Sequence, residues 1–462
     1  MNGLVVAAPR SGSGKTTITL GLLAALTRRS LNVAPAKSGP DYIDTTILAR
    51  AAGREAINLD AWAMSPARLH QLAATQAANA DLLIVEGAMG LFDGAADNRG
   101  STADLAACLG LPVILVLDAD RQSQSIAALA HGFATWRADV KVAGLIVNRA
   151  ASTRHEAMLR RALSALDIPL LGILPTRRSL TLPDRHLGLV LPGEVASFDD
   201  VVQSAAEAME AYVDLNLLLA LSAPSPGASR HPSPQGERGL EAPSRRDLPS
   251  PVEGDGASRS EAGEGKRLSP LGQAIAVARD AAFAFLYPHW LRDWHAAGAT
   301  VSFFSPLANE APDPTADAVF LPGGYPELHG ETLAAASTFH AGLRAARDRG
   351  ALIYGECGGF MVLGQSLTDK SGATYRMAGL LPHETRIDRP KRVLGYRGLT
   401  HASPLPFPAR LTGHEFHYSS ARRTHGTPLF EATDALGESL PPMGLVERNV
   451  MGSYAHVIDI GA

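Results

Sequence analysis

The sequence has few of the features that mark secreted, membrane or nucleic-acid-binding proteins. Two of its 462 residues are cysteines, Cys108 and Cys357, which argues against a disulfide framework and for a reducing compartment. No stretch approaches the roughly 20 uncharged apolar residues of a membrane-spanning helix, and the first residues lack a signal peptide's basic region. Acidic and basic residues number 46 and 42, a formal charge of -4, which attracts neither nucleic acid nor an anionic membrane. We therefore expect a cytoplasmic protein that acts on small molecules.

The composition changes sharply between residues 223 and 270. This stretch contains one Val and no Ile, Met, Phe, Tyr or Trp, so burial of its side chains cannot offset the entropy of ordering the backbone. Overall, 46% of the chain is apolar, enough for two or three domains. We predict a domain over residues 1–220, a disordered linker over 221–271 and a second domain over 272–462.

Both predicted domains belong to the α/β class. Continuous apolar strands that alternate with helical patterns predict a mainly parallel sheet covered on both faces, with ligands at the carboxyl ends of the strands. In the N-terminal part, the predicted strands are 4–8, 32–36, 82–86, 113–118, 142–148 and 170–174, and helices are expected at 16–29, 123–136 and 154–166. In the C-terminal part, strands are expected at 274–278, 300–304, 318–321 and 351–354.

A glycine-rich loop follows the first predicted strand and opens a helix, the context that a phosphate-binding loop requires. Its backbone N–H groups can hold phosphate oxygens, a lysine adds positive charge, and a threonine hydroxyl can bind Mg²⁺. The residues expected to bind the nucleotide are Gly12, Ser13, Gly14, Lys15, Thr16 and Thr17, although Pro9 replaces the usual first glycine. Asn148, at the end of another predicted strand, either hydrogen-bonds a purine base or forms a turn.

Acidic residues follow the next two predicted strands, where they can approach the phosphates. Because Mg²⁺ prefers carboxylate oxygens and phosphates, Asp44 and Glu86 are the candidate metal ligands, together with Thr16. Asp41 and Asp93 either orient a substrate or an acyl phosphate, or cap a turn or helix.

Cys357 lies in a Gly-x-Cys-x-Gly motif between a predicted strand and a helix-like segment. Such a sharp turn presents a nucleophile, and small neighbours allow backbone N–H groups to reach an oxyanion. We predict that Cys357 is a nucleophile, that the N–H groups of Gly324 and Gly358 form an oxyanion hole, and that His456 is the base.

Other residues of similar chemistry have different interpretations. His414 and His417 flank Glu415, but this spacing without a further nearby ligand favours substrate contact or core packing over a metal site. Cys108, on a predicted helix, is expected to pack in the core.

The motifs taken together resemble the cobyrinic (or hydrogenobyrinic) acid a,c-diamide synthases. The matching segments, in that order, are residues 8–17, 37–44, 85–94, 182–189, 278–283, 321–327 and 355–361. The resemblance implies a domain like dethiobiotin synthetase joined to a class I glutamine amidotransferase domain. It also implies ATP- and Mg²⁺-dependent amidation of two corrinoid carboxylates, with ammonia from glutamine and an acyl-phosphate intermediate.

The resemblance assigns the glutaminase nucleophile to Cys357, with His456 raising its nucleophilicity. Class I enzymes usually have a Glu two residues after this His, where this chain has Ile458; Asp459 follows out of phase. We therefore expect a Cys-His dyad.

The expected corrinoid contacts are Asp41, Tyr42, Arg185 and His186, unless these are exposed loop residues. Because related P-loop ligases often pair, a homodimer is a further expectation. Two alternatives stay open: a partition-type P-loop switch ATPase, with Arg10 as its basic residue, and a cobyric acid synthase, which amidates four other positions.

Overall fold

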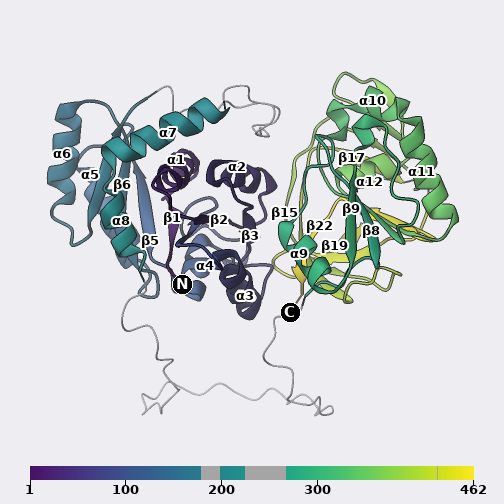
Figure 1. Ribbon diagram of the computed structural model, residues 1–462, viewed down its shortest axis with the longest axis horizontal. Helices are drawn as coiled ribbons and strands as arrows, with labels where there is room; N and C mark the ends of the chain where they lie inside the picture. Colours follow the sequence, from purple (N-terminus) through teal and green to yellow (C-terminus); the bar gives the residue numbers. More distant parts are fainter. Residues whose placement is uncertain (178–197, 224–266, 424, 462) are drawn as a thin grey trace, which may run out of the picture.

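The protein consists of two α/β domains that lie side by side (Figure 1). The computed structural model describes residues 1–177, 198–223, 267–423 and 425–461. Arg185, His186 and most of the predicted linker lie outside these residues. Within the described part of the chain, no helix combines the length and apolar character needed to cross a membrane.

The N-terminal domain is built on a seven-stranded parallel sheet with the order β3-β2-β4-β1-β5-β6-β7. The strands are β1 (Gly3–Ala7), β2 (Val33–Ser38), β3 (Ile57–Leu59), β4 (Leu82–Glu86), β5 (Val113–Asp118), β6 (Val142–Ala150) and β7 (Leu170–Pro175). Almost every residue of these strands is buried, as expected when helices cover both faces of a sheet. This confirms the predicted fold class.

Helices α1, α2 and α7 lie on one side of this sheet, and α3 and α4 lie on the other (Figure 1). The helices of the domain are α1 (Lys15–Arg28), α2 (Tyr42–Ala52), α3 (Pro66–Ala77), α4 (Thr102–Leu109), α5 (Ser125–Thr135), α6 (Thr153–Leu163), α7 (Phe198–Tyr212) and α8 (Leu215–Leu221). Serine side chains cap the N-termini of α3, α4 and α6 by accepting backbone N–H groups. Strands β1, β2 and β4 lie side by side in the sheet and run parallel, so the loops that follow them meet at one edge of the sheet.

The C-terminal domain contains a six-stranded sheet with the order β20-β21-β11-β10-β8-β9, parallel except at β20. Its strands are β8 (Ala274–Ala278), β9 (Thr300–Phe304), β10 (Ala318–Leu321), β11 (Leu352–Glu356), β20 (Leu445–Glu447) and β21 (Val450–Ser453). Its helices are α9 (Pro288–Ala296), α10 (Gly330–Ala335), α11 (Ser337–Asp348) and α12 (Gly358–Leu363).

Two further sheets complete this domain. One has the order β19-β18-β15-β16-β22 and is antiparallel; the other has the order β13-β12-β14-β17. Their strands are β12 (Ser366–Thr368), β13 (Thr374–Arg376), β14 (His383–Arg386), β15 (Val393–Thr400), β16 (Arg410–His417), β17 (Ser420–Arg423), β18 (Phe430–Thr433), β19 (Ser439–Met443) and β22 (His456–Ile460). Many of these strands are half-exposed, so they lack the continuous apolar runs that predicted the parallel strands.

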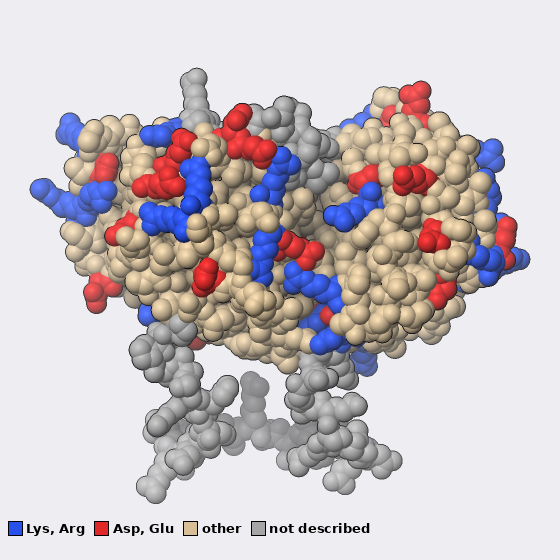
Figure 2. All heavy atoms as spheres, in the orientation of Figure 1, with Lys and Arg blue, Asp and Glu red and all other residues tan. Residues whose placement is uncertain are grey.

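The edges of the predicted linker differ from the structure. Helix α8 reaches Leu221, and Leu268 and Leu271 are buried against the hydrophobic core. On the face shown in Figure 2, acidic and basic side chains are interspersed over both domains.

Candidate active sites

The phosphate loop is braced from the end of β6. Gly14 has a φ of 92°, and a Cβ atom there would lie 2.2 Å from Nδ2 of Asn148, so glycine is required. Nδ2 of Asn148 donates to the Ser13 carbonyl at 3.1 Å, and Arg149 donates to the Gly12 carbonyl at 2.9 Å. Base recognition was one of the two roles expected for Asn148. Its amide nitrogen instead hydrogen-bonds the loop, which leaves its carbonyl oxygen for any contact with a base. The first turn of α1 has no side-chain cap, which leaves its N–H groups for an anion.

Two lysines and two carboxylates converge beside this loop. Lys37 Nζ lies 2.5 Å from Asp44 and 2.9 Å from Glu86, and the Thr16 hydroxyl donates to Glu86 at 2.7 Å. Lys15 donates to the Met89 carbonyl. The structure thus brings Thr16, Asp44 and Glu86 together, as the sequence predicts, and adds Lys37 at their centre.

The charges of this cluster depend on one another. Burial lowers the pKa of Lys15, and the charge of Lys37 lowers it further. Burial also disfavours the charged form of Lys37, but the Asp44 and Glu86 carboxylates outweigh this and raise its pKa. Burial raises the pKa of Glu86 against the opposing charge of Lys37. Oε2 of Glu86 is buried and accepts no hydrogen bond from any described residue, so this oxygen fits a bound cation.

The other two expected substrate aspartates stabilise backbone turns. Asp41 caps α2 by accepting the N–H groups of Ile43 and Asp44 at 2.8 and 3.0 Å. Burial, reinforced by the charge of Asp44, raises the pKa of Asp41 to about 6. Asp93 accepts the Gly90 N–H at 2.8 Å. These contacts match the capping alternative and still leave carboxylate oxygens beside the phosphate loop.

Cys357 occupies a strained turn between β11 and α12. Its φ and ψ are 45° and -104°, a conformation that non-glycine residues rarely adopt and that typifies a nucleophile at a strand-to-helix turn. The turn is held by a 2.8 Å hydrogen bond from the Cys357 N–H to the Ser453 carbonyl. The thiol is buried, and burial followed by the charge of Glu327 raises its pKa. A base or a rearrangement is therefore needed to form the thiolate.

A small pocket of about 40 Å³ opens onto this thiol. Its lining includes Phe285, Gly324, Glu327, Phe416 and Tyr418.

The two glycines of the predicted oxyanion hole lie together. A Cβ atom on Gly358 would lie 3.0 Å from the Gly324 nitrogen. The two residues are therefore neighbours in space, as an oxyanion hole shared between them requires.

His456 lies at the start of β22 and is buried. Nδ1 lies 3.3 Å from the Tyr42 hydroxyl and 3.7 Å from Oε2 of Glu356. Its ring packs so closely on Gly323 that a Cβ atom there would lie 2.4 Å from Cε1. Because Nδ1 faces these two groups, Nε2 is the ring nitrogen left for another partner.

The acids after His456 do not complete a triad. Ile458 is fully buried, and its carbonyl accepts hydrogen bonds from His289 and Trp290. Asp459 pairs with Arg68 of the N-terminal domain at 2.9 Å. Asp459 therefore serves the domain interface.

The remaining histidine candidates border the thiol site: His417 lines the pocket at Cys357, and the His414 ring stacks on His456 with centroids 4.9 Å apart. His414 Nε2 lies 3.1 Å from the Tyr287 hydroxyl, and His417 pairs with Glu415 at 3.2 Å. Within the described residues, no three His, Cys, Asp or Glu side chains form a group able to hold a metal ion. Cys108 is half-buried on α4 and packs against the core.

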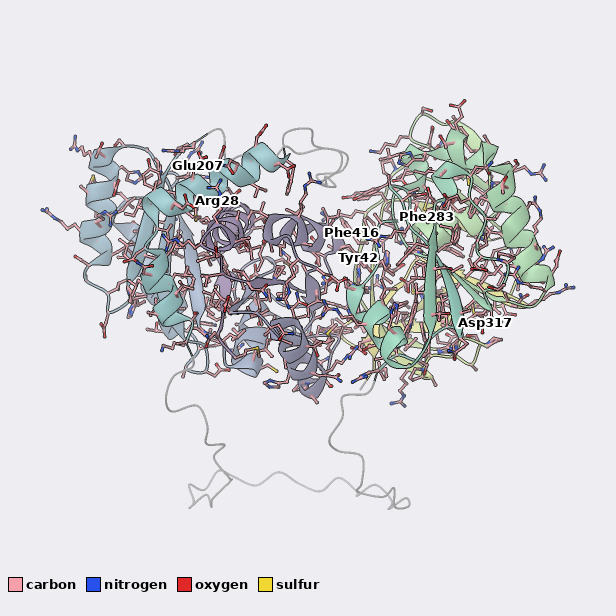
Figure 3. All side chains as sticks on the ribbon, viewed as in Figure 1. Arg28, Tyr42, Glu207, Phe283, Asp317 and Phe416 are labelled. Carbon is pink, nitrogen blue, oxygen red and sulfur yellow. The ribbon has the colours of Figure 1, made fainter. Side chains whose placement is uncertain are left out.

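Tyr42 crosses from the N-terminal domain into the aromatic wall of the thiol site (Figure 3). Its ring centroid lies 5.3 Å from Phe285, 4.2 Å from Tyr287 and 5.3 Å from His456. Burial, followed by Tyr287 and Glu356, raises the pKa of Tyr42 well above its ordinary value, so the phenol keeps its proton. This position differs from the expected corrinoid contact, because the side chain is enclosed by the other domain.

Buried charges hold the two domains together. Arg68 on α3 contacts both Asp459 and Asp293 of the C-terminal domain. The Tyr396 hydroxyl donates to Asp60 at 3.0 Å, and burial raises the pKa of Asp60 to about 6. These contacts fix the geometry across which Tyr42 reaches His456.

Sequence reasoning missed the roles of Lys37 and Glu356. Each is a charged residue at the end of an otherwise apolar strand, β2 or β11. Their positions in the sequence could have indicated these roles, because a charged residue at the carboxyl end of a buried strand needs a partner or a ligand.

Family models match both halves of the chain. Residues 4–190 match the CobQ/CobB/MinD/ParA nucleotide binding domain, and residues 274–460 match the CobB/CobQ-like glutamine amidotransferase domain. Together with the two sites, these matches define a nucleotide-binding domain fused to a glutamine amidotransferase domain.

Curated relatives narrow this class. The chain is 49% identical over 460 residues to the hydrogenobyrinate a,c-diamide synthase of Rhizobium meliloti (strain 1021), covering 99% of each chain. It is 48% identical over 465 residues to the enzyme of that name from Rhodobacter capsulatus, covering 99% of this chain and 98% of the relative. This chain belongs to the family of the hydrogenobyrinate a,c-diamide synthases.

Proposed function

We propose that the protein amidates the a and c side-chain carboxylates of hydrogenobyrinate, using ATP and glutamine, in cobalamin biosynthesis. One observation carries this proposal beyond family membership. Tyr42 and Asp44 lie two residues apart in the first turn of α2, and they reach His456 of the thiol site and Lys37 of the phosphate site. The site that releases ammonia and the site that consumes it are thus both contacted by one helical turn.

The N-terminal site activates the acid. A carboxylate is a poor electrophile, so its oxygen attacks the γ-phosphorus of ATP, ADP leaves, and an acyl phosphate forms. The loop from Gly12 to Thr17 holds the phosphates through its backbone, and Lys15 and Lys37 stabilise the charge on the transferring group. Asp41 and Asp93 orient the substrate acid, and the carbonyl oxygen of Asn148, whose amide nitrogen braces the loop, contacts the nucleotide base.

Mg²⁺ fits the acidic pair beside the loop. Thr16, Asp44 and Glu86 would hold it, and the buried, unpartnered Oε2 of Glu86 is the oxygen that most needs a cation. When bound, Mg²⁺ would neutralise charge on the phosphate oxygens.

The C-terminal site supplies the nitrogen. His456 removes the proton of Cys357, and the sulfur attacks the side-chain amide of glutamine to form a thioester, with the oxyanion held by the N–H groups of Gly324 and Gly358. Protonated nitrogen leaves as ammonia, and water hydrolyses the thioester to glutamate. Ammonia then attacks the acyl phosphate, loses a proton and displaces phosphate.

An assay with defined acids tests this function. Hydrogenobyrinic and cobyrinic acids are each incubated with ATP, Mg²⁺ and either glutamine or ammonium, and the products are weighed by mass spectrometry. We expect two added amides; four would indicate a cobyric acid synthase. Absence of mono- and diamide from both acids, with ATP turnover retained, would favour a switch ATPase.

A further inference from the structure

The imidazole of His456 faces two different partners at one nitrogen. Nδ1 lies 3.3 Å from the Tyr42 hydroxyl, which belongs to the N-terminal domain, and 3.7 Å from Oε2 of Glu356, which precedes the nucleophile. Glu356 is buried and held in place, since Oε1 accepts the Tyr354 hydroxyl at 2.9 Å and the Val457 N–H at 3.0 Å. Oε2 is thus aimed at the histidine by contacts within its own domain.

The two partners favour opposite tautomers of the ring. A carboxylate can only accept, so pairing with Glu356 places the proton on Nδ1 and leaves Nε2 able to take the Cys357 proton. A phenol can donate as well as accept; when the Tyr42 hydroxyl donates to Nδ1, the ring proton sits on Nε2, where it prevents that transfer. In the structure the phenol is the nearer of the two.

The position of Tyr42 is tied to the phosphate site. Asp41 caps the helix turn that carries both Tyr42 and Asp44, and Asp44 pairs with Lys37. Side chains two residues apart in a helix point in nearly opposite directions, so one turn contacts both sites. A ligand that engages Lys37 and Asp44 changes the forces on the same turn that places the Tyr42 hydroxyl.

We propose that Tyr42 and Glu356 compete for Nδ1 of His456, so that the first turn of α2 keeps the glutaminase at rest until the synthetase site is engaged. Glu356 is then a positioning residue that takes the place of the acid missing at Ile458, and Tyr42 is the positioning residue that opposes it. The inference rests on the proposed function of Cys357 and His456 in glutamine hydrolysis.

The test compares Tyr42→Phe, Glu356→Gln and the double variant in the full-length chain. Glutamate release is measured without ATP or corrinoid, and amide formed per glutamate released is measured with both. Tyr42→Phe keeps the ring packing and removes a hydrogen bond of about 1 kcal/mol, so we expect idle glutamine hydrolysis to rise on the order of 3–10-fold, with less amide per glutamate. Glu356→Gln offers an amide donor to Nδ1, and hydrolysis should fall by about 10²-fold or more.

The double variant separates competition from general damage. When the Glu356 carboxylate is absent, freeing Nδ1 of His456 from Tyr42 cannot restore the productive tautomer. The double variant should therefore behave like Glu356→Gln and not show the sum of the two effects. Tyr212→Phe is the matched control, because it removes a hydroxyl of the same domain that contacts Arg177 at the end of α7, outside both sites. Its idle hydrolysis should stay at the wild-type rate.

Several results would overturn the proposal. These are idle hydrolysis unchanged or lowered in Tyr42→Phe, hydrolysis retained in Glu356→Gln, additive effects in the double variant, or an equal rise in Tyr212→Phe. Ammonia-dependent amidation in each variant reports an intact synthetase, and if Glu356→Gln lacks it, the Tyr42→Phe result decides alone. A wild-type protein that hydrolyses glutamine but forms no amide from either nitrogen source would refute the proposed function and leave this test standing.

Discussion

The two active sites obtain their critical contacts from different places. In the phosphate site, Lys37 is neutralised by Asp44 and Glu86, all within the N-terminal domain. In the thiol site, the surroundings are largely aromatic, and the nearest hydrogen-bonding group to His456 is Tyr42 of the other domain. The nucleotide site is therefore self-contained, whereas the glutaminase depends on how the domains dock.

The largest expected effect comes from removing the nucleophile, which should inactivate the glutaminase and leave the synthetase active. Cys357→Ser should lower glutamine-dependent amidation by at least about 10³-fold, because a serine hydroxyl lacks the nucleophilicity of sulfur at this turn. Amidation with ammonium should persist, since the phosphate site needs nothing from Cys357. Parallel assays with the two nitrogen sources check this, and equal losses would show that the two sites are not separable.

Breaking the buried ion pairs between the domains should destabilise the docked arrangement on which the glutaminase depends. Arg68→Met leaves Asp459 buried without a cation and leaves Asp293 only Arg267, at 4.0 Å, which should destabilise the protein by about 3–5 kcal/mol. Urea unfolding followed by tryptophan fluorescence measures this, because Trp290 and Trp294 lie on the helix that carries Asp293. The control is Arg292→Met, which breaks an exposed pair with Glu55 and should cost at most about 1 kcal/mol. Equal losses in both would contradict a special role for Arg68.

Neutralising the centre of the phosphate cluster should impair both nitrogen sources alike. Lys37→Met leaves two carboxylates facing each other where negative phosphates must bind, so amidation should fall by about 10²-fold with glutamine and with ammonium. The initial rates of amide formation measure the effect, and Lys370→Met, at an exposed turn, serves as the control. A selective loss with glutamine would place Lys37 in the coupling between sites.

The smallest expected effect is a change in pH dependence at the interface. The pKa of Asp60 is about 6 in the folded protein and near 3.8 when unfolded, so the folded state binds the extra proton. Stability from this group is therefore lost as pH rises between these values, by about 1 kcal/mol from pH 5 to 7. Urea unfolding at both pH values should show a loss that is about 1 kcal/mol larger in the wild type than in Asp60→Asn, because Asp41, whose pKa is also about 6, contributes to both. An identical pH response in both proteins would refute it.

The parallel core could be predicted because its strands are continuous apolar runs. The ranges 82–86, 113–118, 274–278 and 300–304 coincide with β4, β5, β8 and β9. The short strand β3 and the antiparallel strands of the C-terminal domain gave weaker signals, since their burial is partial or alternates with exposure. Fold class is thus readable where both faces of a strand are buried.

The candidate sites were likewise predictable only in part from the sequence. Motifs placed Cys357, Lys15 and Glu86 on the correct turns, because glycine spacing and strand ends constrain local backbone. The approach of Tyr42 to His456 joins positions 414 residues apart. It depends on docking of two domains, which no local pattern encodes.

Ile458 makes the loss of the usual acid difficult to reverse. The residue is completely enclosed, and its backbone already receives two hydrogen bonds. Introducing glutamate there would bury a new carboxylate without a cation, a cost of several kcal/mol. A single substitution to glutamate would therefore harm the fold before it could improve hydrolysis.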